Sequence, residues 1–134
     1  MTRDVINPKS MYDSLQYGFS HATISQGKKT IHCAGQLAWD ENANPVGGDD
    51  IVAQARQALK NLKTVLKEAG ATPADVVRMK TFVVDHKPEY LASVGAAIAE
   101  FYGDAAPAAN TWLGVQSLAI PGLLIEIEVT AVID

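Results

Sequence analysis

Residues 123–133, LLIEIEVTAVI, decide the fold of this chain. One alternate set of their side chains is apolar and comprises Ile125, Ile127, Val129, Ala131 and Ile133. The other set is mixed and comprises Leu124, Glu126, Glu128, Thr130 and Val132. Because successive side chains of a strand point to opposite faces, this alternation predicts a β-strand with one face buried in a core.

Two segments upstream of this strand have apolar residues at helical spacing. In residues 51–69 they recur every three or four positions, after an Asp-Asp pair suited to the N-cap and first turn and before Gly70. Residues 89–102 carry a second apolar stripe, which ends just before Gly103. We predict an amphipathic helix over each segment.

The remaining strand signals fill the gaps between these helices. Residues 20–25 and 30–36 flank a polar, glycine-containing turn and predict a β-hairpin. Residues 76–84 are rich in β-branched side chains, and residues 111–116 predict a weaker strand. The order hairpin, helix, strand, helix, strand, strand predicts one α+β domain over residues 1–134, with a mixed sheet and both helices on one face.

That arrangement leaves the second face of the sheet uncovered. On the last strand the uncovered face is half apolar and half acidic, a composition most simply buried by another subunit. We therefore expect an oligomer, with any functional site built between subunits.

Composition excludes several classes of function. The 134 residues carry 11 basic and 15 acidic side chains, a net charge of −4, so no basic face for nucleic acid is expected. The single cysteine, Cys33, excludes an internal disulfide and fits a reducing, cytoplasmic compartment. No apolar run approaches the roughly 20 residues that span a bilayer, and no secretory signal is expected at the N-terminus.

Few residues stand out as catalytic or metal-binding. The three histidines are not at metal-ligand spacings, so neither a metal nor another cofactor is expected. Cys33 follows His32, but adjacent strand residues point to opposite faces, which favours an inert buried thiol over a nucleophile. Glu126 and Glu128 share one strand face and either form an acid/base pair with one raised pKa or simply line an interface.

Five stretches carry a resemblance to a known family. They are Tyr17-Gly18-Phe19-Ser20-His21-Ala22, Ala34-Gly35-Gln36, Gln54-Ala55-Arg56-Gln57-Ala58-Leu59-Lys60-Asn61-Leu62, Pro107-Ala108-Ala109-Asn110-Thr111 and Ile125-Glu126-Ile127-Glu128. In these the chain resembles the RidA/YjgF superfamily of enamine/imine deaminases. The resemblance implies a chorismate-mutase-like fold and a homotrimer with clefts between its subunits.

The resemblance also implies a set of cleft residues. Glu126 matches the glutamate that helps to place the attacking water, and Gly35 could offer its backbone N–H to a ligand oxygen. The arginine that holds the substrate carboxylate falls on Ala109, and the nearest other arginine, Arg78, is expected on another strand. Two hydroxyl-bearing positions fall on Phe19 and Ala34, and a helix asparagine falls on Gly95.

These departures predict a more apolar cleft that no longer prefers 2-imino acids. Trp112 is a further candidate for its lining, and His21 and Asn110 are candidate polar groups. His21 could act as a base near neutral pH or could be only a packed side chain. Three functions follow: an imine or enamine hydrolase with Glu126 and His21 as catalytic residues, a non-catalytic trimer that binds a small ligand, or a structural, chaperone-like trimer.

Overall fold

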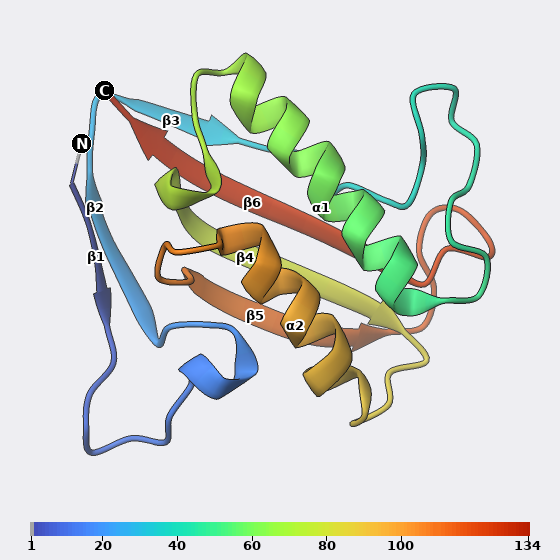
Figure 1. Ribbon diagram of the computed structural model, residues 1–134, viewed down its shortest axis with the longest axis horizontal. Coiled ribbons are helices and arrows are strands. Elements are labelled where there is room, and N and C mark those ends of the chain that lie inside the picture. The colour runs from blue at the N-terminus through green and yellow to red at the C-terminus, as the bar shows by residue number, and fades with distance from the viewer. Residues whose placement is uncertain (1) are drawn as a thin grey trace.

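The computed structural model describes residues 2–134 as two helices packed on one face of a four-stranded sheet (Figure 1). The helices are α1 (Ile51–Glu68) and α2 (Tyr90–Tyr102), and short 3-10 turns lie at Leu15–Tyr17 and Pro73–Asp75. The strands are β1 (Thr2–Ile6), β2 (Ala22–Gln26), β3 (Lys29–His32), β4 (Val76–Val84), β5 (Ala109–Val115) and β6 (Ile125–Ile133). The expected α+β architecture is confirmed.

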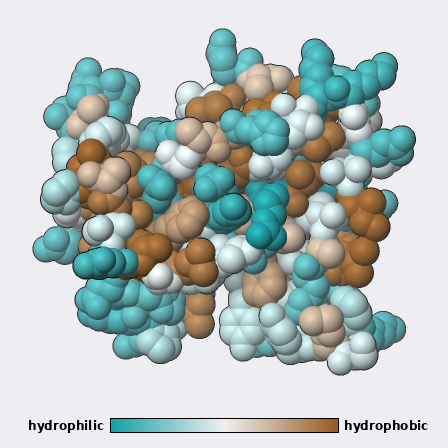
Figure 2. Space-filling model, turned by 180° about the vertical axis from the view of Figure 1, so that it is seen from behind, coloured by the Kyte–Doolittle hydropathy of each residue, from teal (hydrophilic) through white to brown (hydrophobic). Residues whose placement is uncertain are grey.

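The main sheet has the order β3-β6-β4-β5. β4 and β5 are parallel because α2 crosses over between them, whereas β6 runs antiparallel to both β3 and β4. The alternation that predicted β6 holds: Ile125, Ile127 and Ala131 are fully buried under the helices. On the other face Glu126, Glu128 and Thr130 are half-buried. Both helices lie in front of the sheet in Figure 1, and Figure 2, seen from behind, shows polar and apolar side chains interleaved over the uncovered face.

The predicted hairpin of residues 20–36 is wrong. β2 pairs with β1 in a separate two-stranded sheet, and β3 pairs with β6. The intervening turn carries the chain from one sheet to the other, and its Lys28 N–H donates to the Ile133 carbonyl. Both strands were located correctly in the sequence. Their partners are decided by the free edges of β1 and β6, which the sequence of the turn between β2 and β3 does not reveal.

The N-terminal strand β1 was missed because it is short and polar. Arg3 anchors it to the rest of the domain: its Nε donates to the Val76 carbonyl at 2.6 Å and its Nη2 to the Ala106 carbonyl at 2.6 Å. These charge-assisted bonds hold β1 against the start of β4 and the loop before β5.

The caps of α1 follow the sequence. The Asp50 carboxylate accepts from the backbone N–H groups of Val52 and Ala53, and Gly70 adopts a left-handed conformation with φ of 82° after the helix ends. Gln54, only 1% exposed, ties α1 to the approach of β6. Its amide donates to the Gly48 carbonyl and its Oε1 accepts from the Leu124 N–H, at 2.7 and 2.8 Å.

Candidate functional site

The Glu126 carboxyl lies directly over Gly35 on the uncovered face of the sheet. A Cβ placed on Gly35 would come within 2.7 Å of the Glu126 carboxyl carbon, so only glycine leaves the carboxyl this position. Gly35 belongs to a bulge: the Cys33 N–H donates to the Val129 carbonyl and the Gln36 N–H to the Ile127 carbonyl, so that Ala34 and Gly35 together face Glu128. The bulge therefore brings the backbone of Gly35 close to a carboxylate.

Two causes alter the acidity of Glu126. Burial, and then the negative charge of Glu128, raise the pKa of Glu126 above that of an ordinary glutamate. The N–H of Gly35 beside it donates no hydrogen bond within residues 2–134. This corner of the sheet thus combines the Glu126 carboxyl, whose pKa is raised, with the free N–H of Gly35. Ala34, the preceding residue, is exposed.

A second group of predicted residues meets at β5, on the helix-covered side of the sheet. An aromatic pocket of about 270 Å³ is lined by Tyr12, Tyr17, Phe19, Leu91, Asn110 and Trp112. Asn110 and Trp112 pair in register with Met79 and Thr81, so both side chains point to the helix-covered face of the sheet. The sequence left this orientation open, because a shift of one residue would have exchanged the two faces.

Polar groups are sparse in the aromatic pocket. The Thr81 hydroxyl donates to the Asn110 Oδ1 at 3.2 Å, which leaves the Asn110 amide protons available. The Trp112 Nε1 and the His86 Nε2 are buried without a hydrogen-bond partner. The aromatic lining therefore suits an apolar or aromatic group, and the Asn110 amide is the group of the lining that can donate to it.

His21 is part of the wall behind this pocket. Its Nε2 lies 2.9 Å from the Tyr12 carbonyl, and its ring packs edge-on to Tyr12 and Phe19 at 4.7 and 5.9 Å. Its backbone N–H donates to the Asn7 Oδ1. These contacts match the packed-residue alternative for His21, and they place it in a different group from Glu126.

Ala109 begins β5 and lies in register with Arg78 of β4. The Arg78 Nη2 donates to the Thr111 hydroxyl at 2.6 Å, so the guanidinium reaches across the uncovered face of β5. Separation of the two residues in the chain hid this neighbour from sequence reasoning. The parallel pairing of β4 and β5 is the signal that could have found it, because it aligns the starts of the two strands.

The predicted site residues therefore form two separate groups in one protomer. Glu126 pairs with Phe82, whereas the β4 partner of Ala109, Arg78, pairs with Thr130. Glu126 and Thr130 are four residues apart on β6, which corresponds to about 13 Å. The aromatic pocket is separated from Glu126 in another way: Asn110 and Trp112 point to the helix-covered face and Glu126 to the uncovered face, so the sheet lies between them within one protomer.

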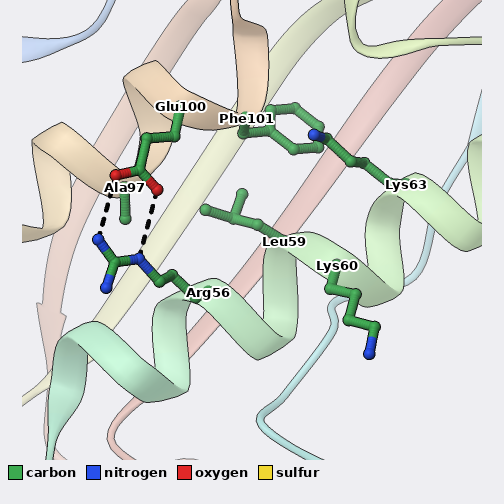
Figure 3. A pocket seen from close by; sticks show the side chains of 7 residues that line it. All are labelled: Arg56, Leu59, Lys60, Lys63, Ala97, Glu100 and Phe101. Carbon is green, nitrogen blue, oxygen red and sulfur yellow. Dashed lines mark hydrogen bonds and ion pairs between the residues drawn. The ribbon is translucent and has the colours of Figure 1, made fainter.

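Other features of the surface do not add to either group. Figure 3 shows a groove between α1 and α2, where Arg56 and Glu100 pair at 3.1 Å and Lys63 lies 5.8 Å from the Phe101 ring centre. An exposed pair of this kind contributes little binding or stability. Cys33 is packed in the core, and burial raises the pKa of its thiol, as expected of an inert cysteine.

Within residues 2–134 no three histidine, cysteine or acidic side chains gather as a metal site would require. Over the same residues no helix has the length and apolarity to cross a membrane.

Comparison with known proteins gives the same family throughout. The family model described as endoribonuclease L-PSP matches residues 13–133. YyfB of the Rid family from Yersinia pestis, a protein of unknown function, is 57% identical, with 98% of this chain and 99% of that chain covered and a TM-score of 0.96. Rv2704 from Mycobacterium tuberculosis, of the YjgF/YER057c/UK114 family, is 32% identical over 98% and 99% of the two chains, with a TM-score of 0.64.

Proposed function

Because this chain belongs to the Rid/YjgF family, the family of the endoribonuclease L-PSP model, we propose that it hydrolyses a small imine or enamine in a cleft between the subunits of a homotrimer. The observation that carries this proposal is the Glu126 carboxyl held against Gly35, next to a backbone N–H without an acceptor. A carboxylate of raised pKa beside a free donor suits the activation of water near a polarised carbon.

The reaction needs one base and one place for the substrate. The Glu126 carboxylate accepts a proton from a water as the water oxygen bonds to the imine carbon, and the imine nitrogen takes up a proton. Collapse of the resulting carbinolamine breaks the C–N bond, releases ammonia and leaves a carbonyl compound. The Gly35 N–H orients an oxygen of the substrate during both steps.

The homotrimer is supported by the separation of the two residue groups. Glu126 and Gly35 of one protomer would face the aromatic pocket of Phe19 and Trp112 of another, so that one cleft holds both. The uncovered sheet face, half apolar and half polar, would be buried in the same assembly.

A direct test uses ammonia release from imines generated in place by an amino-acid or amine oxidase, with spontaneous hydrolysis subtracted. We expect acceleration by the unmodified protein and a loss of at least about 100-fold in Glu126→Gln. Glu128→Gln is the matched control, since it removes a neighbouring carboxylate on the same face and should retain turnover. Equal loss in both variants, or none in either, contradicts the role of Glu126.

A second function, non-catalytic binding of a small ligand, is supported by the aromatic pocket and the available amide protons of Asn110. Under it, an aromatic ligand would bind with unchanged affinity in Glu126→Gln, and no imine would be hydrolysed. A structural, chaperone-like trimer would show neither binding nor turnover. Ribonuclease action is not proposed, because a net charge of −4 provides little attraction for a polyanion.

A further inference from the structure

Residues 8–20 form a closed loop between β1 and β2, and this loop supplies half of the lining of the aromatic pocket. The ends of the loop are neighbours, because β1 and β2 pair with one another along their whole length. Three of the six lining residues belong to the loop: Tyr12, Tyr17 and Phe19. The contacts that hold the loop in shape therefore decide the shape of the pocket.

The loop turns apolar side chains outward and polar side chains inward. Met11, Tyr12 and Leu15 are exposed. Ser14 and Ser20, in contrast, are each only 1% exposed. Because buried hydroxyl groups need hydrogen-bond partners, the interior of the loop depends on polar contacts.

Asn7, directly after β1, supplies these polar contacts. Its Oδ1 accepts from the Ser14 hydroxyl at 3.1 Å and from the His21 backbone N–H at 2.9 Å. Its Nδ2 donates to the Ser20 hydroxyl at 3.3 Å. One amide thus joins the start, the middle and the end of the loop. Its loss would remove a partner from two buried hydroxyl groups and one backbone N–H.

A second anchor fixes the loop against α2. The 3-10 turn at Leu15–Tyr17 ends at Gly18, which has a left-handed φ of 81°. A Cβ on Gly18 would lie 3.3 Å from the Gly95 carbonyl oxygen, so the backbone of the loop touches the helix there. Phe19, the next residue, reaches the pocket beside Leu91 of α2. This contact fixes only the second half of the loop.

Tyr12 lies in the first half of the loop, and two other rings pack against it. Its ring centre lies 6.5 Å from that of Tyr17 and 6.4 Å from that of Phe19, with an interplanar angle of 65° in both pairs. Rings set at such angles offer a guest both faces and edges, which an aromatic ring matches better than a saturated ring does. The match lasts only while Tyr12 keeps its place.

We propose that Asn7 is a positioning residue that holds Tyr12, and with it the aromatic wall of the pocket, in the geometry that selects an aryl group over a saturated ring. This inference rests on the proposed function, because it specifies the side chain that the substrate imine carries. The substrate class becomes imines or enamines with an aryl group, which the pocket holds while Glu126 of another protomer activates water.

The test measures binding, so it does not depend on turnover. The probes are 2-phenylethanol and 2-cyclohexylethanol, which differ only in the ring, and their dissociation constants are measured by NMR titration of the whole protein. We expect the unmodified protein to bind 2-phenylethanol about 2- to 10-fold more tightly. Asn7→Leu, which keeps the size of the side chain without its amide, should lose this preference. An unchanged ratio of the two constants in Asn7→Leu overturns the proposal.

Two further variants separate positioning from folding. Asn7→Asp keeps both acceptor contacts, and the Ser20 hydroxyl can turn to donate to the new carboxylate, so the preference should be retained. Asn61→Leu is the matched control, because Asn61 is a half-buried asparagine that donates to the Leu37 and Trp39 carbonyls in another loop. It should lower stability and leave the ratio unchanged. Loss of the preference in either variant counts against a specific role for Asn7.

Tyr12→Leu keeps the inference testable if Asn7→Leu does not fold. Tyr12 is an exposed side chain, so its replacement should have little effect on stability. The variant should nevertheless lose the preference for 2-phenylethanol, since the ring that Asn7 positions is gone. A folded Tyr12→Leu protein that keeps the preference contradicts the inference, as does an Asn7→Leu protein that binds both probes equally less tightly.

This inference and the hydrolase proposal fail in different ways. If imines are hydrolysed through Glu126 and the probe preference does not depend on Asn7, the hydrolase proposal stands and the Asn7 inference is wrong. If the preference depends on Asn7 but no imine is hydrolysed, the pocket is a binding site and the hydrolase proposal is wrong.

Discussion

The carboxyl of Glu126 rests on the bare Cα of Gly35, where a Cβ would approach its carboxyl carbon to 2.7 Å. The two residues belong to β6 and to the bulge that follows β3. A contact this close makes the position of the carboxyl depend on the absence of a side chain. The proposed activation of water by Glu126 therefore requires glycine at position 35.

Gly35→Ala should displace the Glu126 carboxyl while changing the free energy of unfolding only slightly. The added methyl group meets the end of a flexible side chain, so Glu126 swings away at a cost to folding of about 1 kcal/mol or less. Imine hydrolysis should fall at least about 10-fold, since a displaced base no longer reaches the water. If the loss acts through Glu126, Gly35→Ala will cause no further loss in a Glu126→Ala background. Full activity in Gly35→Ala contradicts the assignment.

The dependence of activity on pH should report Glu126. Because its pKa is raised, first by burial and then by Glu128, the acid limb of kcat/KM should have its midpoint above the ordinary value for glutamate. Glu128→Gln removes the second cause and should move that midpoint to lower pH while retaining the limb. A midpoint that does not move shows that Glu126 is not the titrating group.

Stability should change with pH in the corresponding sense. A carboxyl whose pKa is raised in the folded state binds its proton more tightly there than in the unfolded chain. Its protonation therefore stabilises the folded protein at low pH. That contribution is lost as pH rises from the unfolded-state pKa through the folded-state pKa. Glu126→Gln should therefore raise the melting temperature near pH 7 and have a smaller effect near pH 4. Destabilisation that is greatest near pH 7 would contradict the direction of this pKa shift.

Gln54→Met should destabilise the approach to β6. The substitution retains the shape of a side chain that is 1% exposed but leaves the Gly48 carbonyl and the Leu124 N–H without their partner. Gly48 is exposed, so its carbonyl can turn to water, and the half-buried Leu124 N–H carries most of the cost. We expect a loss of about 1–3 kcal/mol in denaturant unfolding. The exposed Lys60→Met on the same helix should leave the midpoint unchanged. Equal midpoints in both variants would show that Gln54 does not tie the two segments together.

Much of the architecture could be predicted from local patterns. The strand over residues 76–84 was predicted with the bounds of β4, and both helices to within one residue at either end. Apolar periodicity, the aspartate that caps α1 and the glycines after both helices are local signals. The pairing of β2 with β1 could not be predicted, since strand partners are chosen across the whole chain. For the same reason the register that sets Arg78 of β4 beside Ala109 of β5 could not be predicted, although Arg78 was correctly placed on another strand.

The sequence indicated which residues belong to the candidate site better than it indicated where they lie in space. Phe19, Asn110 and Trp112 do line one pocket, and Glu126 does lie beside Gly35. Their division into two groups depends on register and strand order, which no spacing in the sequence contains. The packing of His21 against Tyr12 depends on the path of residues 7–21, which carry little regular structure.

The claim that one cleft is built from two protomers is tested most directly by mixing inactive variants. Phe19→Ala damages the aromatic group and Glu126→Gln the hydrolytic group, and each homotrimer should be nearly inactive alone. After co-refolding of equal amounts, a random trimer places both intact groups in about a quarter of its clefts. We therefore predict recovery of about a quarter of the unmodified ammonia-release rate. A mixture that stays as inactive as its components, in trimers shown to have exchanged subunits, would contradict a site shared between protomers.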